Sequence, residues 1–227
     1  MSLSRVQPIN WDRVNTVLLD MDGTLLDLHF DTYFWTQYLP KKYSEIHATP
    51  LNKITPEIHR RLKEKQGTLD WYCTGYWSRE FNLDIISAKN EVKHLVTERP
   101  QALEFLNILG TIGKRRILVT NADRPSLELK FSMTSIESAL DVVVSSHDYA
   151  VPKEKQQFWH QLQDNISFEP SRTVFIDDSE SVLNAAKTYG IKALYGISMP
   201  DSRQLHPSEM PFPVIEDFLH LLGPVNG

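Results

Sequence analysis

Two pairs of carboxylates follow apolar runs that lie far apart in the chain. The run Asn15–Asp20 leads into Asp22, and the run Thr173–Asp177 leads into Asp178. Like charges that are brought together are unfavourable unless a cation neutralises them. Because carboxylate oxygens are hard ligands, Mg²⁺ suits them, and it usually binds one or two carboxylates together with waters and a substrate phosphate. If the four acids meet, they therefore predict a site for metal-assisted phosphoryl transfer.

A hydroxyl and an ammonium group follow two further apolar runs. Thr120 ends the run Arg116–Thr120, and Lys153 comes shortly after the run Asp141–Ser145. Ligands of open parallel sheets bind at the carboxyl ends of the strands, so we expect these side chains beside the four acids. A carboxylate there can act as a nucleophile through an aspartyl-phosphate. A second acid two residues along can protonate the leaving oxygen and then deprotonate water.

Each of these signals also has a purely structural interpretation. A single Asp-x-Asp can be a turn, and Asp177-Asp178-Ser179 can be a helix cap, since Asp and Ser favour that position. Thr120 could be an ordinary strand end and Lys153 the solvated start of a helix. Their joint placement at successive strand ends favours a functional site.

The apolar runs themselves predict the fold. They are short, rich in Val, Ile and Leu, and lack polar alternation, which is typical of strands buried on both faces of a parallel sheet. Helical patterns lie between them over Pro100–Leu109, Leu127–Leu140, Pro152–Leu162 and Glu180–Tyr189, the last with Ser179 as N-cap and Gly190 at its end. We expect a doubly wound, mainly parallel α/β sheet of the Rossmann-like kind with about five strands, namely Asn15–Asp20, Arg116–Thr120, Asp141–Ser145, Thr173–Asp177 and Ile191–Tyr195.

The interval between the first two runs is far longer than a crossover needs. It reads as helical, and eleven of the 23 aromatic residues lie within positions 30–81. We predict an inserted all-helical domain at 28–98 with a core of its own, and an α/β core domain made of 1–27 and 99–227.

Composition excludes several other classes of protein. The net charge is −5 with no basic block, which disfavours binding to a nucleic-acid polymer. One cysteine cannot form an internal disulfide, and no segment resembles a signal peptide or reaches the ~20 apolar residues of a membrane span. We therefore expect a soluble cytoplasmic protein whose oligomeric state stays open.

Four short strings resemble the motifs of the haloacid dehalogenase-like hydrolase superfamily, in the same order and at the same strand ends. They are DMDGT, the Thr of LVTNA, the Lys of VPKEK, and FIDDS. The resemblance implies that Asp20 is the nucleophile and Asp22 the general acid and base. It also implies that Thr120 donates to the phosphate and that Lys153 offsets the charge of the nucleophile and the phosphate.

The same resemblance implies a Mg²⁺ site and a cap. Asp20 and Asp177 would bind the ion, Asp22 would bind it through its backbone carbonyl, and Asp178 would support it directly or through water. The insertion resembles the helical cap that covers the active site and selects the substrate in that superfamily.

Longer strings resemble the bacterial GMP/IMP 5′-nucleotidases within the superfamily. They include TVLLDMDGTLLDLHFDTYFW, LDWYCTGYWS, PKEKQQFWH and FIDDSESVLNAA, and the likeness runs from about Val17 to Gly196. It implies hydrolysis of purine nucleoside monophosphates. The stretch Lys41–Lys65 matches none of these strings, although its basic cluster could send one arginine to the substrate.

Aromatic rings in the insertion are candidates for stacking on a nucleobase. Trp71, Tyr72, Tyr76 and Trp77 fit one helix, although the same rings could instead form the core of the insertion. The candidate substrate contacts are Gly23, Thr24, Asp27, Tyr33, Trp71, Tyr72 and Asn121.

Other functions remain open on the sequence. The same chemistry could serve a sugar phosphate or another small phosphorylated metabolite, and a phosphomutase is possible because the insertion offers Lys and His. A binding module without catalysis is a third option, but every residue that the reaction requires is present.

Overall fold

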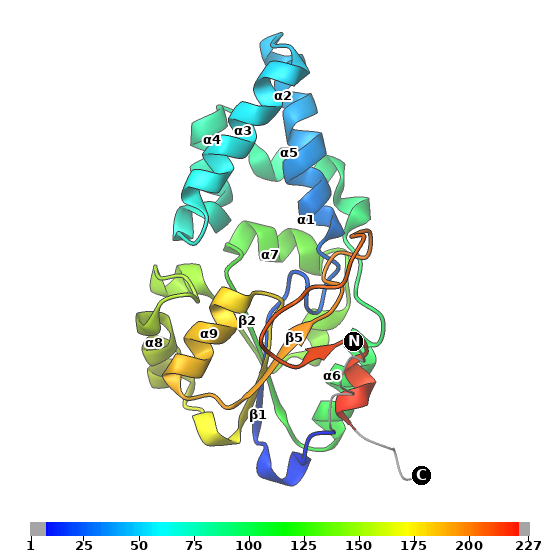
Figure 1. Cartoon of the computed structure of the whole chain (residues 1–227), viewed down its shortest axis with the longest axis vertical. Helices are drawn as coiled ribbons and strands as arrows, with labels where there is room; N and C mark the ends of the chain where they lie inside the picture. The colour runs from blue at the N-terminus through cyan, green and yellow to red at the C-terminus, as the bar shows by residue number, and fades with distance from the viewer. Residues whose placement is uncertain (1–7, 223–227) are drawn as a thin grey trace.

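A six-stranded parallel sheet forms the centre of the molecule (Figure 1). The computed structural model describes residues 8–222. The strand order is β3-β2-β1-β4-β5-β6, and every neighbouring pair is parallel. The strands are β1 (Thr16–Leu19), β2 (Arg115–Thr120), β3 (Val142–Ser145), β4 (Thr173–Ile176), β5 (Ala193–Ile197) and β6 (Val214–Ile215).

The predicted α/β fold with a parallel sheet is confirmed, with one more strand than expected. The extra strand, β6, has two residues and pairs with Gly196 and Ile197 of β5 at the sheet edge. It follows a stretch that contains Pro200, Pro207, Pro211 and Pro213, and a two-residue strand leaves no periodicity to detect. Because β1 pairs with both β2 and β4, the carboxyl ends of these three strands are adjacent.

Both faces of the sheet are buried, as the apolar runs predict. Leu18 packs with α8 (Gln156–Ile166) and α9 (Glu180–Tyr189) on one face, whereas Val17 and Leu19 face the cluster that contains α6 (Ala102–Thr111) and the 3-10 helix Phe218–Leu221. Each face of β1 thus buries apolar side chains that are fully shielded from water, which fixes the strand rigidly.

Two predicted helices begin or end elsewhere. The helix predicted at Leu127–Leu140 is α7 (Arg124–Phe131), followed by a separate 3-10 turn at Ile136–Ala139. The hydroxyl groups of Ser132 and Thr134 bond to backbone carbonyls of the last turn, and such side-chain bonds favour ending a helix.

The helix predicted from Pro152 is α8, which begins at Gln156, so Lys153 lies in the turn before it. The expected bounds of α9 are confirmed, and Gly190 ends it with a φ of 118°. Ser179 occupies the N-cap position, but its side chain makes no capping bond there.

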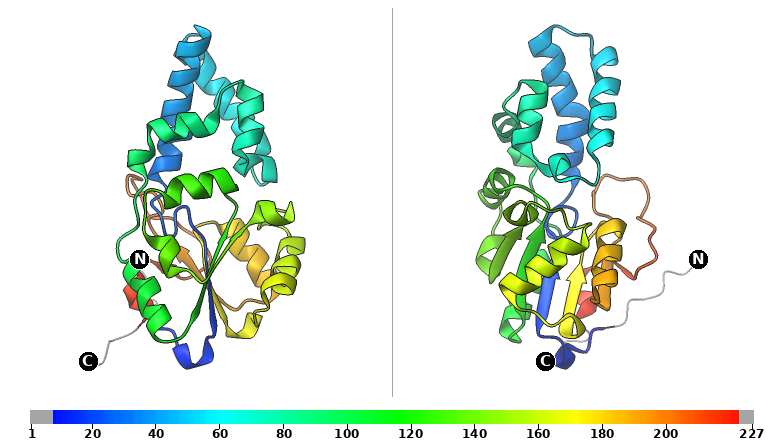
Figure 2. Two further views of the ribbon diagram at one scale, coloured as in Figure 1. Left: turned by 180° about the vertical axis from the view of Figure 1, so that it is seen from behind. Right: turned by 90° about the vertical axis from the view of Figure 1, so that its left-hand side faces the viewer.

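Helices of the insertion lie together beyond the carboxyl ends of the strands, with α7 between them and the sheet (Figures 1 and 2). We call residues 28–98 the helical insertion. Its helices are α1 (His29–Tyr33), a π turn (Phe34–Tyr38) that continues into α2 (Leu39–His47), α3 (Leu51–Lys65), the 3-10 helix Leu69–Tyr72, α4 (Thr74–Phe81), α5 (Ile85–Glu91) and the 3-10 helix Lys93–Leu95.

The single helix expected to carry four aromatic residues is broken. Trp71 and Tyr72 lie in the 3-10 helix, whereas Tyr76 and Trp77 lie in α4. Cys73 separates them in an extended conformation and caps α4, because its sulfur accepts a hydrogen bond from the Tyr76 amide. The four aromatic residues therefore lie on two short helices instead of one.

The insertion shares its apolar core with the sheet instead of forming a separate one. Phe34, Trp77 and Phe81 belong to the same cluster of buried side chains as Leu19. The insertion therefore packs directly on the α/β core.

The chain enters and leaves the insertion at one place. The Asp27 amide donates to Thr97 at 2.9 Å, and the Arg99 amide donates to Leu25 at 2.9 Å. The two connections thus run side by side and hold each other in place.

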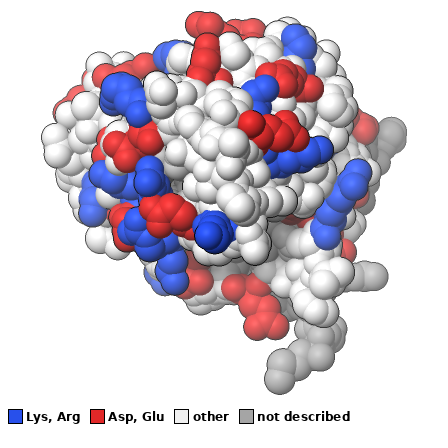
Figure 3. Space-filling model, turned by 90° about the horizontal axis from the view of Figure 1, so that it is seen from above, with Lys and Arg blue, Asp and Glu red and all other residues white. Residues whose placement is uncertain are grey.

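Acidic and basic side chains are interspersed on the face of the insertion seen from above (Figure 3). Within residues 8–222, none of the helices combines the length and the apolar character needed to traverse a bilayer.

Candidate active site

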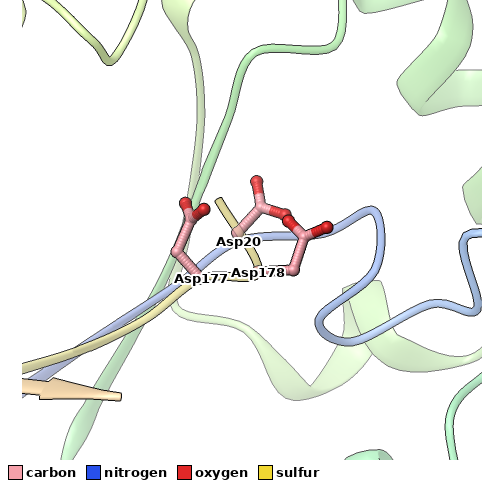
Figure 4. Close-up of side chains that lie close together, drawn as sticks. All are labelled: Asp20, Asp177 and Asp178. Atoms are coloured by element: carbon pink, nitrogen blue, oxygen red, sulfur yellow. The ribbon is translucent and has the colours of Figure 1, made fainter. Parts of the chain in front are cut away.

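Three carboxylates converge where β1 and β4 end. One oxygen from each of Asp20, Asp177 and Asp178 lies within 4.8 Å of the others, and the close-up shows the three groups together beyond the strand ends (Figure 4). Asp20 directly follows β1, and its amide donates to Ile176 of β4 at 3.0 Å. The sheet register therefore brings the three acids together.

Lys153 supplies the positive charge at this point. Its ammonium donates to Asp20 Oδ1 at 2.5 Å, to Asp177 Oδ2 at 2.7 Å and to the Val119 carbonyl at 3.1 Å. The side chain is only 2% exposed. Burial disfavours an ammonium ion, but the charges of Asp177 and Asp20 hold the pKa of Lys153 above its ordinary value.

One ammonium does not balance three carboxylates, of which Asp20 and Asp177 are buried and Asp178 is half-buried. Burial raises the pKa of Asp20 to about 6, against the opposing effect of Lys153. Burial and the charges of Asp20 and Asp177 raise the pKa of Asp178 well above its usual value. A divalent cation would relieve this repulsion, and an all-oxygen donor set suits Mg²⁺. The acidic cluster therefore fits the predicted ion.

Asp22 lies apart from the three acids and faces the same cavity. Its Oδ1 accepts a hydrogen bond of 2.6 Å from the ammonium of Lys130, on α7. Burial raises the pKa of Asp22 to about 6, although Lys130 opposes this. A carboxyl group with such a pKa can hold or release a proton near neutral pH, as acid–base catalysis requires.

Thr120 and Asn121 follow β2 beside the acids. The Thr120 hydroxyl lines the cavity and accepts a hydrogen bond from the Ala122 amide at 3.0 Å. Asn121 accepts from the Lys153 amide at 2.9 Å and donates to Glu154 at 3.1 Å. Asn121 therefore fixes the backbone next to Lys153, in addition to lining the cavity.

A cavity of about 570 Å³ connects this polar floor with the helical insertion. That volume lies in the usual range of small-molecule sites. On the insertion side, the wall includes Trp35, Trp71 and Tyr72. Two of the predicted aromatic contacts, Trp71 and Tyr72, are thus placed against the cavity, whereas Trp77 is buried in the core.

Tyr72 also connects the insertion to the core. Its hydroxyl donates to Glu154 at 2.7 Å, and burial and that carboxylate raise the pKa of the tyrosine. A second contact involves Asp123, whose Oδ2 accepts from the amide of Thr74 at 2.7 Å and from its hydroxyl at 2.5 Å. Its Oδ1 accepts from the amide of Ser126 at 3.2 Å, so one carboxylate caps both α4 and α7.

Four predicted substrate contacts do not line the cavity. Asp27 accepts hydrogen bonds from the backbone amides of His29 and Ser202, which fixes the loop after β1. Tyr33 packs against the apolar cluster that the insertion shares with the sheet, and Thr24 is fully buried. Gly23 lies behind the acids.

Gly23 has a structural reason to be glycine. Its φ is 80°, and a Cβ there would lie 2.4 Å from Asp178 Oδ2. A side chain would thus displace one of the three acids.

Three charged residues of the site, two of them buried lysines, escaped the sequence analysis. Lys130 on α7, Asp31 on α1 and Lys89 on α5 line the cavity and form ion pairs with one another. None follows a strand. Asp31 lies within the string TVLLDMDGTLLDLHFDTYFW, but nothing in that string assigned it a role, and neither Lys89 nor Lys130 belongs to any of the quoted strings. The only available signal was the presence of lysines within otherwise apolar stretches of the chain.

Polar residues at the end of α3 also reach the cavity, namely His59 and Lys63 of the helix and Gln66 directly after it. The sequence suggested that an arginine of this stretch could contact the substrate. Instead, Arg60 and Arg61 pair with Glu57 on the helix surface, and Lys63 is the basic residue that faces the cavity.

Comparison with protein families gives a clear result. The model of the haloacid dehalogenase-like hydrolases matches residues 14–190. The match includes every residue of the acidic cluster as well as Asp22, Thr120 and Lys153.

Individual relatives agree with that match. The chain is 37% identical to the GMP/IMP nucleotidase YrfG of Escherichia coli over 94% of its length and 96% of the relative. It is 24% identical to a phosphorylated carbohydrates phosphatase of Thermotoga maritima over 85% of its length and 90% of the relative. The fold is also similar to that of a crystallised phosphatase of Thermococcus onnurineus, with a TM-score of 0.75, 20% identity, and coverage of 92% and 98% of the two chains.

Proposed function

The chain belongs to the haloacid dehalogenase-like hydrolase family and is a phosphoric monoester hydrolase, and we propose that it releases phosphate from purine nucleoside 5′-monophosphates, with GMP and IMP preferred. One observation carries the reaction type: three carboxylates and a buried lysine form the floor of a cavity that Asp22 also faces. The substrate class rests on the 37% identity to a GMP/IMP nucleotidase.

Asp20 is the proposed nucleophile. Its carboxylate attacks the phosphorus of the ester, and the bond to the nucleoside oxygen breaks as Asp22 donates a proton to that oxygen. Lys153, which already contacts Asp20 Oδ1, offsets the charge that gathers on the phosphate. The products of this step are the free nucleoside and a phosphorylated Asp20.

Water completes the reaction. Asp22, now ionised, takes a proton from water, which attacks the phosphorus and releases inorganic phosphate from Asp20. The Thr120 hydroxyl lies at the end of β2, where it can donate to a phosphate oxygen. A Mg²⁺ ion held by Asp20, Asp177, Asp178 and the backbone carbonyl of Asp22 would neutralise phosphate oxygens in both steps.

The helical insertion is the proposed substrate selector. We assign residues 28–98 to a cap domain, and 1–27 with 99–227 to the core domain. Trp71 and Tyr72 line the cavity on the side of the insertion, where a base can stack on an aromatic ring. The proposed partner is a small phosphate ester and not a nucleic-acid polymer, and the single cysteine favours the cytoplasm.

A phosphate-release screen tests this proposal. Purified protein with Mg²⁺ is assayed against purine and pyrimidine nucleoside monophosphates and against sugar phosphates, with the Asp20→Asn variant in parallel. We expect the highest kcat/KM for GMP and IMP and no turnover by the variant. Turnover by Asp20→Asn that survives removal of contaminating phosphatases would disprove the mechanism.

The same screen addresses the alternative of a sugar phosphate substrate. This alternative is favoured by the identity to a carbohydrate phosphatase and by the hydroxyls of Thr32 and Thr36 at the cavity wall. A preference for sugar phosphates would replace the purine proposal, and a flat profile would remove it while leaving the phosphatase.

A further inference from the structure

Lys130 is a buried lysine between two carboxylates that belong to different parts of the molecule. Its ammonium donates to Asp22 Oδ1 at 2.6 Å and to Asp31 Oδ2 at 2.6 Å, and its side chain is 3% exposed. Asp22 belongs to the core, in the loop after β1, whereas Asp31 lies on α1 of the insertion. One ammonium group therefore joins the insertion to a group of the active site.

The bond from Lys130 uses only one oxygen of Asp22. Within residues 8–222, no hydrogen-bond donor contacts the other oxygen, Oδ2, and the side chain remains 23% exposed at the cavity. A carboxyl group that is held by one oxygen has a fixed orientation and keeps the second oxygen for a proton. This is the arrangement that proton transfer to a leaving group at a defined place requires.

Asp31 in turn holds Lys130 in place. Its Oδ2 accepts from Lys130, and its Oδ1 accepts at 2.8 Å from Lys89 on α5, whose side chain is 4% exposed. With both oxygens committed, Asp31 restricts where the ammonium of Lys130 can lie. Lys89, Asp31, Lys130 and Asp22 thus form a continuous line of charges that alternate in sign, in which the two lysines are buried and the two carboxylates are half-buried.

We propose that Lys130, held by Asp31 of the insertion, is a positioning residue that orients the Asp22 carboxyl group for proton transfer. Asp22 is then aligned when the insertion is seated on the core, so that the part of the molecule that selects the substrate also aligns the acid. This inference rests on the proposed function, because it takes Asp22 as the acid that protonates the leaving oxygen.

Dependence on the leaving group distinguishes positioning from a purely structural role. The 5′ oxygen of IMP must be protonated as it departs, whereas the nitrophenolate of p-nitrophenyl phosphate departs without a proton. Loss of proton donation therefore lowers the rate with IMP more than the rate with the aryl ester, whereas a distorted site lowers both. The ratio of the two kcat/KM values is the readout, since kcat/KM reports the steps up to departure of the leaving group and not the later hydrolysis of phosphorylated Asp20.

The experiment compares Lys130→Met with Lys130→Arg and Lys89→Met in the full-length protein with Mg²⁺. We expect Lys130→Met to lower kcat/KM for IMP by about 100-fold or more, the usual contribution of a positioned acid, and that for the aryl ester by much less. Lys130→Arg restores part of the ratio because it can still donate to both carboxylates. Lys89→Met removes the second partner of Asp31 without touching Asp22, so we expect the ratio to change in the same direction but by less. Lys187→Met, at an exposed position of α9 that does not line the cavity, is the control and keeps the ratio of the wild type.

Removal of Lys130 leaves Asp22 without an ion-pair partner and Asp31 with Lys89 alone, and the variant could fail to fold. Asp31→Asn then decides, because it keeps an acceptor for Lys130 while removing the charge that holds it, and we expect the same loss for IMP on a smaller scale. The proposal is wrong if kcat/KM falls by the same factor for IMP and for the aryl ester in a variant that still unfolds cooperatively. Asp22→Asn is measured alongside. If its loss is the same for IMP and for the aryl ester, Asp22 is not the acid that protonates the leaving group. If Asp22→Asn loses more with IMP but Lys130→Met does not, only the positioning role of Lys130 is disproved.

Discussion

The two walls of the cavity are built in different ways. On the core side, the chemical groups directly follow β1, β2 and β4, or lie in the turn before α8, and hydrogen-bonded strands fix them. On the insertion side, the lining comes from helices and a 3-10 turn, and it is made of aromatic and polar side chains. The sheet can thus hold reacting groups within narrow tolerances, while the helices can change their side chains without disturbing those groups.

This difference indicates a division of work between the two walls. The core determines what reaction takes place, and the insertion determines which ester enters. Because specificity depends on differences in transition-state binding, a few side chains of the insertion are enough to change it. The ion pairs of Lys130 are an exception to this division, because they connect Asp31 of the insertion to Asp22 of the core.

Loss of Lys153 should have the largest effect and should not depend on the substrate. Lys153→Met leaves Asp20 and Asp177 buried without their common partner, so we expect turnover of every phosphate ester to fall by at least ~1000-fold. The loss of a buried pair also lowers the free energy of unfolding, by about 3–5 kcal/mol. Phosphate release and urea denaturation measure the two effects. Lys155→Met, the same change at an exposed position two residues away, is the control. A variant of Lys153 that discriminates among substrates would contradict the division.

Trp71→Leu should have a smaller effect that does depend on the substrate. If a purine stacks on this ring, kcat/KM for IMP falls by about 5- to 150-fold, which corresponds to a stacking energy of about 1–3 kcal/mol. The value for p-nitrophenyl phosphate changes little, because the reacting groups are intact. Tyr76→Leu is the matched control, since Tyr76 lies on α4 and does not line the cavity. Equal losses for both esters would show that Trp71 only supports the fold.

Mg²⁺ should stabilise the protein by a few degrees, and more at pH 8 than at pH 5. Burial raises the pKa of Asp20 from 3.8 to about 6 and that of Asp178 well above its usual value, so the native state holds more protons than the unfolded chain between about pH 4 and pH 6. The stability of the metal-free protein therefore falls as the pH rises through this range. At pH 5, protons also compete with Mg²⁺ for these carboxylates, whereas at pH 8 they do not. The rise in Tm on addition of Mg²⁺ measures this, at about 2–4 °C per kcal/mol for a chain of this size.

Asp178→Asn tests whether that stabilisation comes from the acidic cluster. The variant removes one of three candidate ligands, and we expect a smaller rise in Tm at pH 8. A rise that is the same at both pH values, or that is unchanged in the variant, would place the ion elsewhere.

The sequence predicts the core wall well because its groups are defined by where strands end. Asp20, Thr120 and Asp177 each end or follow an apolar run, and parallel strands bring such ends together whatever the connections between them. The strand bounds were accordingly within a few residues of those observed, and β6 was missed because two residues carry no pattern.

Contacts between the insertion and the core are harder to predict because these groups meet only through helix packing. Lys130 and Asp31 are 99 positions apart, and no local pattern indicates that α7 and α1 bring them together. The single helix expected around Trp71 fails for a local reason, since the aromatic spacing is compatible with a helix but does not reveal the extended residue Cys73.

The shared cap at Asp123 imposes a design rule on anyone who exchanges such insertions between proteins. Both oxygens of this core carboxylate are occupied, one by the first turn of α7 and the other by Thr74 of the insertion. A transplanted insertion that lacks a helix N-terminus and a hydroxyl at that point would leave Oδ2 of the buried Asp123 carboxylate without a hydrogen-bond donor. The junction therefore has a required partner at position 74, and a chimera must carry it even when every side chain that contacts the substrate is new.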